Sequence, residues 1–179
     1  MSLSESAKAI EMASFDQCSK ALEYIRTKTS TSPKIGIVCG SGLGGIGDLV
    51  VDPIQFPYKE IPGFHESSVT GHKSRLLVGK LAGVDVVLMQ GRFHGYEGIP
   101  YSQCAFPIRV MKLMGIEKLI VTNAAGGLNK NFKLGDFMVL EDHLRKNSKT
   151  SKKLLENLLF LSLFLNFWYL LQCGLEIIH

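Results

Sequence analysis

Short apolar runs alternate with helical repeats along most of the chain. An apolar residue recurs at helical intervals after Ser14, which has capping-box spacing with Gln17, and this predicts an N-terminal helix. Its apolar positions are Phe15, Cys18, Leu22 and Ile25. A second helix is expected from Ser102 to Gly115, and an irregular segment with three prolines over residues 48–72. Runs of Val, Ile and Leu predict strands over residues 35–39, 75–79, 84–89, 119–122 and 136–141. This alternation of strands and helices is typical of an α/β fold.

A loop with five glycines follows the first predicted strand. The stretch 34–47 reads KIGIVCGSGLGGIG, so the apolar run ends abruptly at Gly40. Glycine allows sharp turns and close approach to a ligand, and successive backbone N–H groups in such a loop form a concave anion site. Ser41 adds a hydroxyl donor. The hypothesis is an oxyanion, most simply phosphate, held at the carboxyl end of a strand. A tight turn without a ligand is the structural alternative.

The same loop satisfies a dinucleotide-binding pattern. Gly40, Gly42 and Gly45 have the GxGxxG spacing, and Glu60 lies about where a ribose-binding acid is expected. That pattern requires a long helix after the loop, whereas residues 48–57 contain two prolines and several β-branched residues. A dinucleotide site therefore stays a weaker alternative. The loop lacks Gly-Lys-Ser/Thr, which excludes the P-loop of nucleoside triphosphatases.

A second dense stretch, QGRFHGYEG, ends the strand predicted over 84–89. The guanidinium of Arg92 can grip an oxyanion with a planar fork of N–H groups, and His94 can exchange a proton near neutral pH. Glu97 is close enough in sequence to orient the imidazole of His94, and Tyr96 can contact a sugar or a base. A third strand end, TNAAGG, offers small residues whose backbone N–H groups, including that of Ala124, can face a ligand. One anion bound by all three loops would explain these residues together.

Composition bounds the protein class. The chain has 179 residues, 46% of them hydrophobic, and a net charge of +4, which fits a globular domain. Residues 1–143 carry 15 Lys and Arg against 14 Asp and Glu, so the basic excess belongs to residues 144–179, which carry 5 against 2. The main body therefore lacks the charge pattern of a nucleic-acid-binding surface. The four cysteines are widely dispersed, which suggests neither a zinc site nor a disulfide framework, and no metal is expected. Residues 1–14 lack the apolar core of a signal peptide, so we expect a cytoplasmic protein with reduced thiols.

The motifs in their order and spacing resemble the trimeric purine nucleoside phosphorylases. The resemblance rests on GSGLGG, the Gly71–His72 pair, QGRFHGYEG and TNAAGGLN, and covers about residues 10–143. It implies a mixed central sheet flanked by helices and the phosphorolysis of purine nucleosides, including deoxyribonucleosides, to a free base and (deoxy)ribose 1-phosphate. Inorganic phosphate would be the co-substrate, no other cofactor would be needed, and the assembly would be a homotrimer.

The same resemblance assigns roles residue by residue. Phosphate would be bound by one group of residues, Tyr96 would contact the ribose, and Glu97 would hold His94 as its catalytic partner. The phosphate group comprises Ser41, His72, Arg92, His94 and the backbone N–H of Ala124. The family's base-recognising Glu and Asn lie in a C-terminal half without a counterpart in this sequence. We therefore expect a C-terminally truncated fold that alone is inactive or nearly so.

Residues 144–179 form a tail unlike the family. A basic stretch, LRKNSKTSKK, precedes an apolar region over 154–173, whose core 158–171 is apolar except for Ser162 and Asn166. That core is shorter than the ~20 residues that span a bilayer, so membrane anchoring is a minor alternative, and a core helix is another. The favoured interpretation is a truncated isoform or gene-model product whose end is not family sequence. Two classes of function follow: a phosphorylase, or a non-catalytic subunit that binds phosphate or joins a mixed oligomer.

Overall fold

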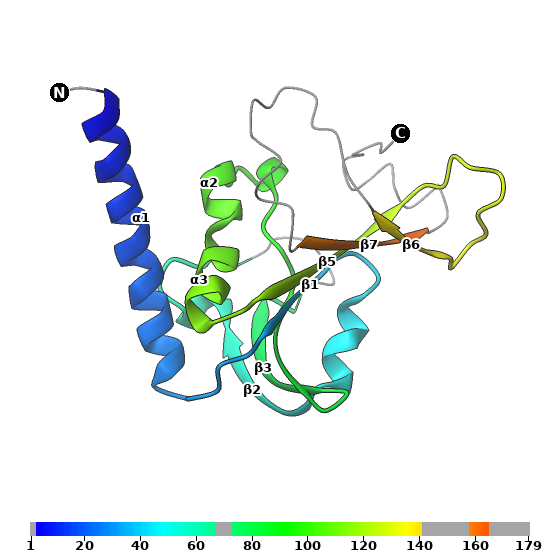
Figure 1. Ribbon diagram of the computed structural model, residues 1–179, viewed down its shortest axis with the longest axis horizontal. Helices are drawn as coiled ribbons and strands as arrows, with labels where there is room; N and C mark the ends of the chain where they lie inside the picture. Colours follow the sequence, from blue (N-terminus) through cyan, green and yellow to red (C-terminus); the bar gives the residue numbers. More distant parts are fainter. Residues whose placement is uncertain (1–2, 67–72, 141–157, 165–179) are drawn as a thin grey trace.

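The computed structural model describes residues 3–66, 73–140 and 158–164, with side chains over 15–66, 73–100 and 103–140. A single sheet of seven strands organises this part of the chain (Figure 1). In spatial order the strands are β2 (Val51–Pro57), β3 (Arg75–Leu81), β4 (Val84–Gln90), β1 (Ile35–Cys39), β5 (Lys118–Ala125), β7 (Leu158–Phe164) and β6 (Phe137–Leu140). Strands β4, β1, β5 and β7 are parallel to one another, whereas β2, β3 and β6 pair antiparallel with their neighbours. The predicted α/β class with a mixed central sheet is confirmed.

The helices lie on one face of this sheet. Helix α1 (Leu3–Arg26) packs against α3 (Phe106–Met114), which follows the short α2 (Tyr101–Cys104) (Figure 1). Alternate strand residues face this layer, and the core there includes Ile25, Leu76, Val78, Val87, Met89 and Met111. The intervening residues, such as Ile37, Leu77 and Leu88, face the 3-10 helix η1 (Gly44–Leu49) on the other side. Two further 3-10 turns are η2 (Tyr58–Glu60) and η3 (Gly95–Glu97). Both faces of the central strands are therefore covered, as their apolar runs require.

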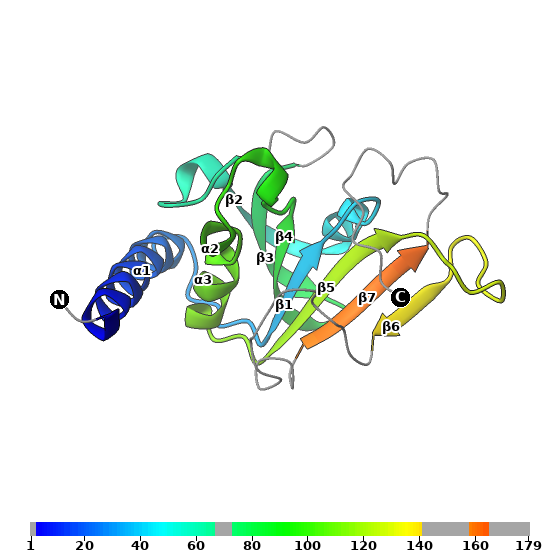
Figure 2. The ribbon, with the colours of Figure 1, turned by 90° about the horizontal axis from the view of Figure 1, so that it is seen from above.

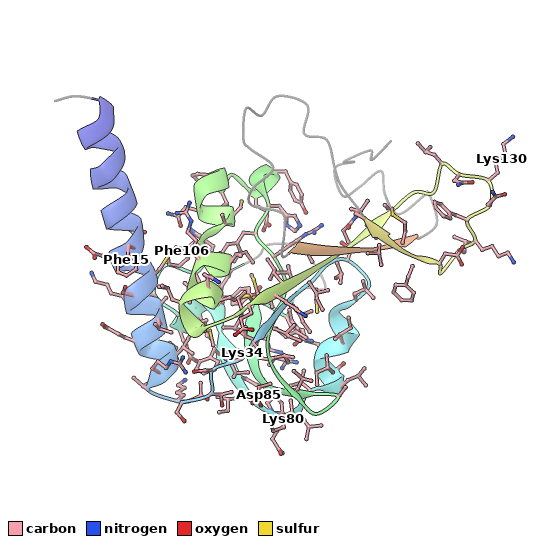
Figure 3. All side chains as sticks on the ribbon, in the orientation of Figure 1. Phe15, Lys34, Lys80, Asp85, Phe106 and Lys130 are labelled. Atoms are coloured by element: carbon pink, nitrogen blue, oxygen red, sulfur yellow. The ribbon has the colours of Figure 1, made fainter. Side chains whose placement is uncertain are left out.

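Helix α1 begins earlier than the sequence pattern predicted. It starts at Leu3, so the capping pair inferred at Ser14 lies inside the helix and the predicted start is wrong. Residues 3–13 are rich in Ala, Glu and Met, which favour helix without any cap at Ser14. Phe15 lies on α1 and is 59% exposed (Figure 3). Cys18 and Ile25 are buried as expected. The second predicted helix is confirmed, although Ala105 separates α2 from α3 and Pro107 stands in the first turn of α3.

Residues 48–72 are more regular than expected. Strand β2 occupies 51–57 despite Pro53 and Pro57, so the prediction of an irregular segment is wrong there. Proline lacks a backbone donor, but β2 is an edge strand, and its register with β3 shifts between Val51 and Ile54. Residues 67–72, which include His72, lie outside the described residues.

The apolar tail contributes a strand. Residues 158–164 form β7, which pairs with β5 on one side and β6 on the other (Figure 2). Neither helical alternative for the tail therefore applies to this segment. A short run that is apolar except for Ser162 suits a strand with a neighbour on each side, and periodicity alone cannot distinguish it from a buried helix. No helix among the described residues is long and apolar enough to cross a membrane. The division of the chain at residue 143 stays a prediction.

Candidate functional site

Three strand ends meet at one rim of the sheet. Strand β1 lies between β4 and β5 and runs parallel to both, with Cys39 beside Gln90 and Val38 beside Val121. The carboxyl ends of parallel strands lie at the same edge of a sheet, and α/β proteins bind ligands there. The loops expected to share one anion therefore do begin side by side.

The first residue of the glycine loop touches β5 directly. The N–H of Gly40 donates to Oγ1 of Thr122 at 2.9 Å, and this hydroxyl donates to the carbonyl of Val38 at 3.0 Å. A Cβ on Gly40 would lie 2.2 Å from the carbonyl oxygen of Thr122, so only glycine fits. Thr122 is 1% exposed. Sequence reasoning missed its role, because a threonine in a strand is ordinary and its partner is 82 residues away.

Backbone direction places Ala124 at the same rim. Residues 123–125 were expected in a loop, but they belong to β5, because β7 extends the sheet beside them. In a strand, the N–H and C=O of one residue point to the same side, and the direction alternates along the chain. The carbonyl of Thr122 faces Gly40, so the N–H of Ala124 is directed to that side too, beyond the last residue of β1. Ser41, half-buried, is the next residue after Gly40.

A chain of polar contacts runs from β5 into the loop after β4. Nη1 of Arg92 donates to the carbonyl of Thr122 at 3.5 Å, and Nε donates to Nε2 of His94 at 3.2 Å. Oε1 of Glu97 lies 2.8 Å from Nδ1 of His94 and also accepts from the backbone N–H of His94 at 3.1 Å. One carboxylate oxygen of Glu97 thus holds both the ring and the backbone of His94. The predicted pairing of Glu97 with His94 is present in the structure.

These contacts fix the form of the imidazole. Nε2 of His94 accepts a bond from a guanidinium, which has only donors, so the proton sits on Nδ1 and points at Glu97. Burial lowers the pKa of His94 and the neighbouring charge of Arg92 lowers it further, whereas the bond to Glu97 opposes both. A neutral imidazole with a fixed tautomer is therefore the ground state near pH 7.

Tyr96 and Tyr58 support this loop differently. The ring of Tyr96 stacks on His94 with centroids 4.6 Å apart and is 59% exposed, so much of its surface faces solvent. Tyr58 is fully buried, and its hydroxyl donates to the carbonyl of Gly91 at 2.6 Å. Gly91 has φ of 110°, a conformation that favours glycine, so this bond holds the sharp turn that directs Arg92. Burial raises the pKa of Tyr58, which keeps it a hydrogen-bond donor.

The dinucleotide alternative lacks its structural context. The glycine loop leads into the six-residue η1 and then into β2, not into a long helix. Glu60 is engaged elsewhere: its carboxylate accepts from the hydroxyl of Tyr24 at 2.6 Å and from Lys28 at 3.1 Å. Within the described ranges, no three His, Cys, Asp or Glu side chains gather as a metal site. The expectation that no metal is needed stays a prediction.

The strands that form this rim lie in the part of the chain that matches known proteins. A family model described as the phosphorylase superfamily matches residues 34–157, which include β1, β4 and β5. The chain belongs to the phosphorylase superfamily. The match ends at residue 157, inside the segment 144–179 that the sequence analysis treats as the tail.

Within the superfamily, the relatives found are purine nucleoside phosphorylases. Purine nucleoside phosphorylase 1 of Geobacillus stearothermophilus is 50% identical over 125 residues, 70% of this chain and 46% of the relative. The Rattus norvegicus enzyme is 46% identical over 130 residues, 73% of this chain and 45% of its own. The crystal structure of the Schistosoma mansoni enzyme in complex with acetate has 53% identity and a TM-score of 0.66, covering 72% of this chain and 47% of that one.

The resemblance inferred from the motifs is therefore confirmed. A purine nucleoside phosphorylase structure in complex with ribose-1-phosphate is also similar, with 52% identity and a TM-score of 0.67 over 72% of this chain and 47% of that one. This member of the superfamily thus spans about half the length of the relatives it matches. The structure gathers Ser41, Arg92, His94, Glu97 and Ala124 at one rim, with Tyr96 stacked on His94 beside them, while His72 falls outside the described residues.

Proposed function

We propose that this chain binds inorganic phosphate as the phosphate-holding part of a purine nucleoside phosphorylase. The observation that carries the proposal is the continuous set of contacts from Gly40 through Thr122 and Arg92 to His94 and Glu97. It joins three strand ends at one rim. Donors of three kinds surround that rim: backbone N–H groups, a hydroxyl and a guanidinium. Such a set suits an oxyanion with several acceptor oxygens.

Each residue has a distinct role in this proposal. The hydroxyl of Ser41, the N–H of Ala124 and the guanidinium of Arg92 donate to phosphate oxygens. His94 is held by Glu97 through Nδ1, and its Nε2 accepts from Nε of Arg92 in this structure. When phosphate takes over the guanidinium, Nε2 would accept the proton of monohydrogen phosphate or donate after protonation. These groups hold one another in position, so the bound phosphate would already be oriented for attack when the nucleoside arrives.

The reaction follows from that position. A phosphate oxygen forms a bond to C1′ of the nucleoside while the bond from C1′ to the purine nitrogen breaks, and the purine leaves with the electron pair. The anion beneath the ribose stabilises the positive charge that develops on the sugar. Tyr96, exposed and stacked on His94, would contact the ribose. Residues that activate the purine were not identified in this sequence, so we propose little or no turnover by this chain alone.

A second candidate function is that of a non-catalytic subunit. Its supporting observation is an apolar surface on β6 and the preceding loop, where Leu134, Phe137 and Val139 are 68%, 61% and 57% exposed. Figure 3 shows this loop, marked by Lys130, projecting from the body of the sheet. Exposed apolar patches mark association surfaces. We propose association with other phosphorylase subunits as its use, with the family's trimer as the expected assembly. The cytoplasmic location stays a prediction.

Isothermal titration of the full chain with inorganic phosphate tests the main proposal. We expect Arg92→Gln to weaken binding at least about tenfold, because a charge-assisted hydrogen bond is worth about 1.5–3 kcal/mol. Lys118→Gln is the matched control, since Lys118 is an exposed cation at the opposite end of β5. Absence of phosphate binding, or equal losses in both variants, would reject the proposal.

Two further measurements separate the candidates. A coupled assay of inosine phosphorolysis should detect little or no turnover, and rapid turnover would show that the chain supplies its own base site. Light scattering after size-exclusion chromatography gives the assembly state. A trimer supports the phosphorylase assembly, a monomer rejects self-association, and mixing with a full-length relative tests the mixed oligomer.

A further inference from the structure

The side chain of Gln90 is buried beneath the glycine loop. Gln90 is the last residue of β4 and is 1% exposed. The buried polar residues among those described are Thr29, Gln90 and Thr122, which are 8%, 1% and 1% exposed. A buried amide is costly unless both its ends are hydrogen-bonded. Gln90 meets this condition: its Nε2 donates to the carbonyl of Gly44 at 2.5 Å, and its Oε1 accepts from Nε of Arg75 at 2.5 Å.

Arg75 determines which way this amide points. A guanidinium has only donors, so it fixes the oxygen of Gln90 toward β3 and thereby directs the NH₂ group toward the loop. Arg75 stands directly across from Gln90 in the antiparallel pair of β3 and β4. Its Nη1 also donates to Oε1 of the exposed Gln55 at 2.8 Å. The orientation of the amide is thus set by the sheet.

The loop also wraps closely around this side chain. A Cβ on Gly47 would lie 2.1 Å from Nε2 of Gln90, so the loop backbone rests on the amide at its far end as well. Gln90 therefore touches η1 at Gly44 and at Gly47, while Thr122 holds the loop entrance at Gly40. Between these points lie Gly42 and Ser41, the part of the loop that faces the rim.

We propose that Gln90 is a positioning residue that holds the glycine loop in the shape that binds the anion. The inference rests on the proposed phosphate site and adds a group that does not touch the phosphate itself. Without the bond to Gly44, the loop would keep its anchor at Gly40 and lose the one at η1. Phosphate binding would then have to order the loop, which weakens affinity.

Three variants of the full chain test this role. Gln90→Met keeps the length of the side chain and removes both hydrogen bonds. Gln90→Glu keeps the bond from Arg75 and replaces the donor to Gly44 by a carboxylate oxygen, which cannot donate to that carbonyl. It serves as the second variant if Gln90→Met does not fold. Gln55→Met is the matched control, because it removes another partner of Arg75 from an exposed position that does not contact the loop.

Amide hydrogen exchange without phosphate is the first readout. The N–H groups of Leu43, Ile46 and Val50 bond within the loop and report its order. We expect both Gln90 variants to accelerate their exchange about tenfold, in line with the loss of one buried hydrogen bond, and Gln55→Met to change it less than twofold. Exchange in β3 and β4 should change little. Wild-type exchange rates in the loop, or equal acceleration throughout the sheet, would overturn the proposal.

Phosphate affinity is the second readout. We expect the Gln90 variants to bind inorganic phosphate about tenfold more weakly and Gln55→Met to bind like the wild type. Unchanged affinity in both Gln90 variants would overturn the positioning role. If the wild type itself fails to bind phosphate, the proposed function is rejected, and the exchange rates still decide whether Gln90 holds the loop.

Discussion

The contact between Gly40 and β5 makes one substitution especially informative. In Gly40→Ala the added methyl group would lie 2.2 Å from the carbonyl oxygen of Thr122 and 2.9 Å from Cα of Asn123. Real Cβ atoms essentially never approach closer than 3.0 Å, so the first gap must open by 0.8 Å. Both opposing atoms are backbone, so no side-chain rotation relieves the clash. The strands β1 and β5 must separate at the rim.

The expected cost is large for a single methyl group. Overpacking of a well-packed interior costs typically about 1–3 kcal/mol, and we expect the upper end because a strand pair must move. Separation also lengthens the bond from the N–H of Gly40 to Thr122, now 2.9 Å. We therefore expect a loss of about 3 kcal/mol in the free energy of unfolding, a sizeable part of the 5–15 kcal/mol typical of a domain.

Gly45→Ala is the matched control in the same loop. A Cβ on Gly45 would meet nothing within 4 Å, and its backbone does not adopt a positive φ. We expect its stability to stay within about 0.5 kcal/mol of the wild type. Urea unfolding followed by far-ultraviolet circular dichroism gives both values, with the slope m checked for constancy. Equal stability of Gly40→Ala and Gly45→Ala would refute the close approach of β1 and β5 at this rim.

Three further predictions concern the hydroxyl, the imidazole and the tail strand. Thr122→Val should lower the free energy of unfolding in urea by about 2 kcal/mol, because it leaves the buried N–H of Gly40 without an acceptor. Thr122→Ser keeps the hydroxyl and should cost only about 1 kcal/mol for the lost methyl group; a reversed order of the two variants would contradict this role. The pKa of His94 is lower in the folded state, so on acidification the unfolded state binds a proton before the folded state does. The contribution of His94 to the free energy of unfolding is therefore full above about pH 6.5 and is lost as pH falls through the folded pKa. NMR titration should show the pKa of His94 falling further in Glu97→Gln; a rise would refute the assigned bond. Leu161→Pro should cost about 3 kcal/mol or more by removing a backbone donor between two strands, and unchanged stability in urea would place β7 outside the sheet.

The elements that sequence reasoning found are those with local signals. The strand 35–39 is a largely apolar run that ends at glycine, and the predicted strands 75–79 and 84–89 flank a turn at Ala82–Gly83, where both residues have positive φ. Strand β2 was missed because its prolines are tolerated only at a sheet edge, and edge position is not visible in sequence. Residues 123–125 looked like a loop because they are small, yet pairing with β7 extends β5 through them.

In the candidate site, too, residues close together in sequence could be predicted and those far apart could not. Arg92, His94 and Glu97 lie within six residues, so their cooperation could be predicted from spacing, and the Glu97 contact is confirmed by its 2.8 Å distance. The supports Thr122 and Gln90 could not be found this way. Each is an ordinary polar residue in its strand, and each acts on a glycine far away in sequence, by 82 and 46 residues respectively. Such roles depend on which strands become neighbours.

The sequence distance between Gly40 and Thr122 has a consequence for folding. The rim is complete only after β5 docks beside β1, which closes a loop of 82 residues, and such non-local pairing is slow compared with hairpin formation. The β3–β4 hairpin can form early from neighbouring residues. A nascent chain that has not yet emerged past Ala125 therefore has the glycine loop but no anion site, and binding competence arises in a single late step during synthesis.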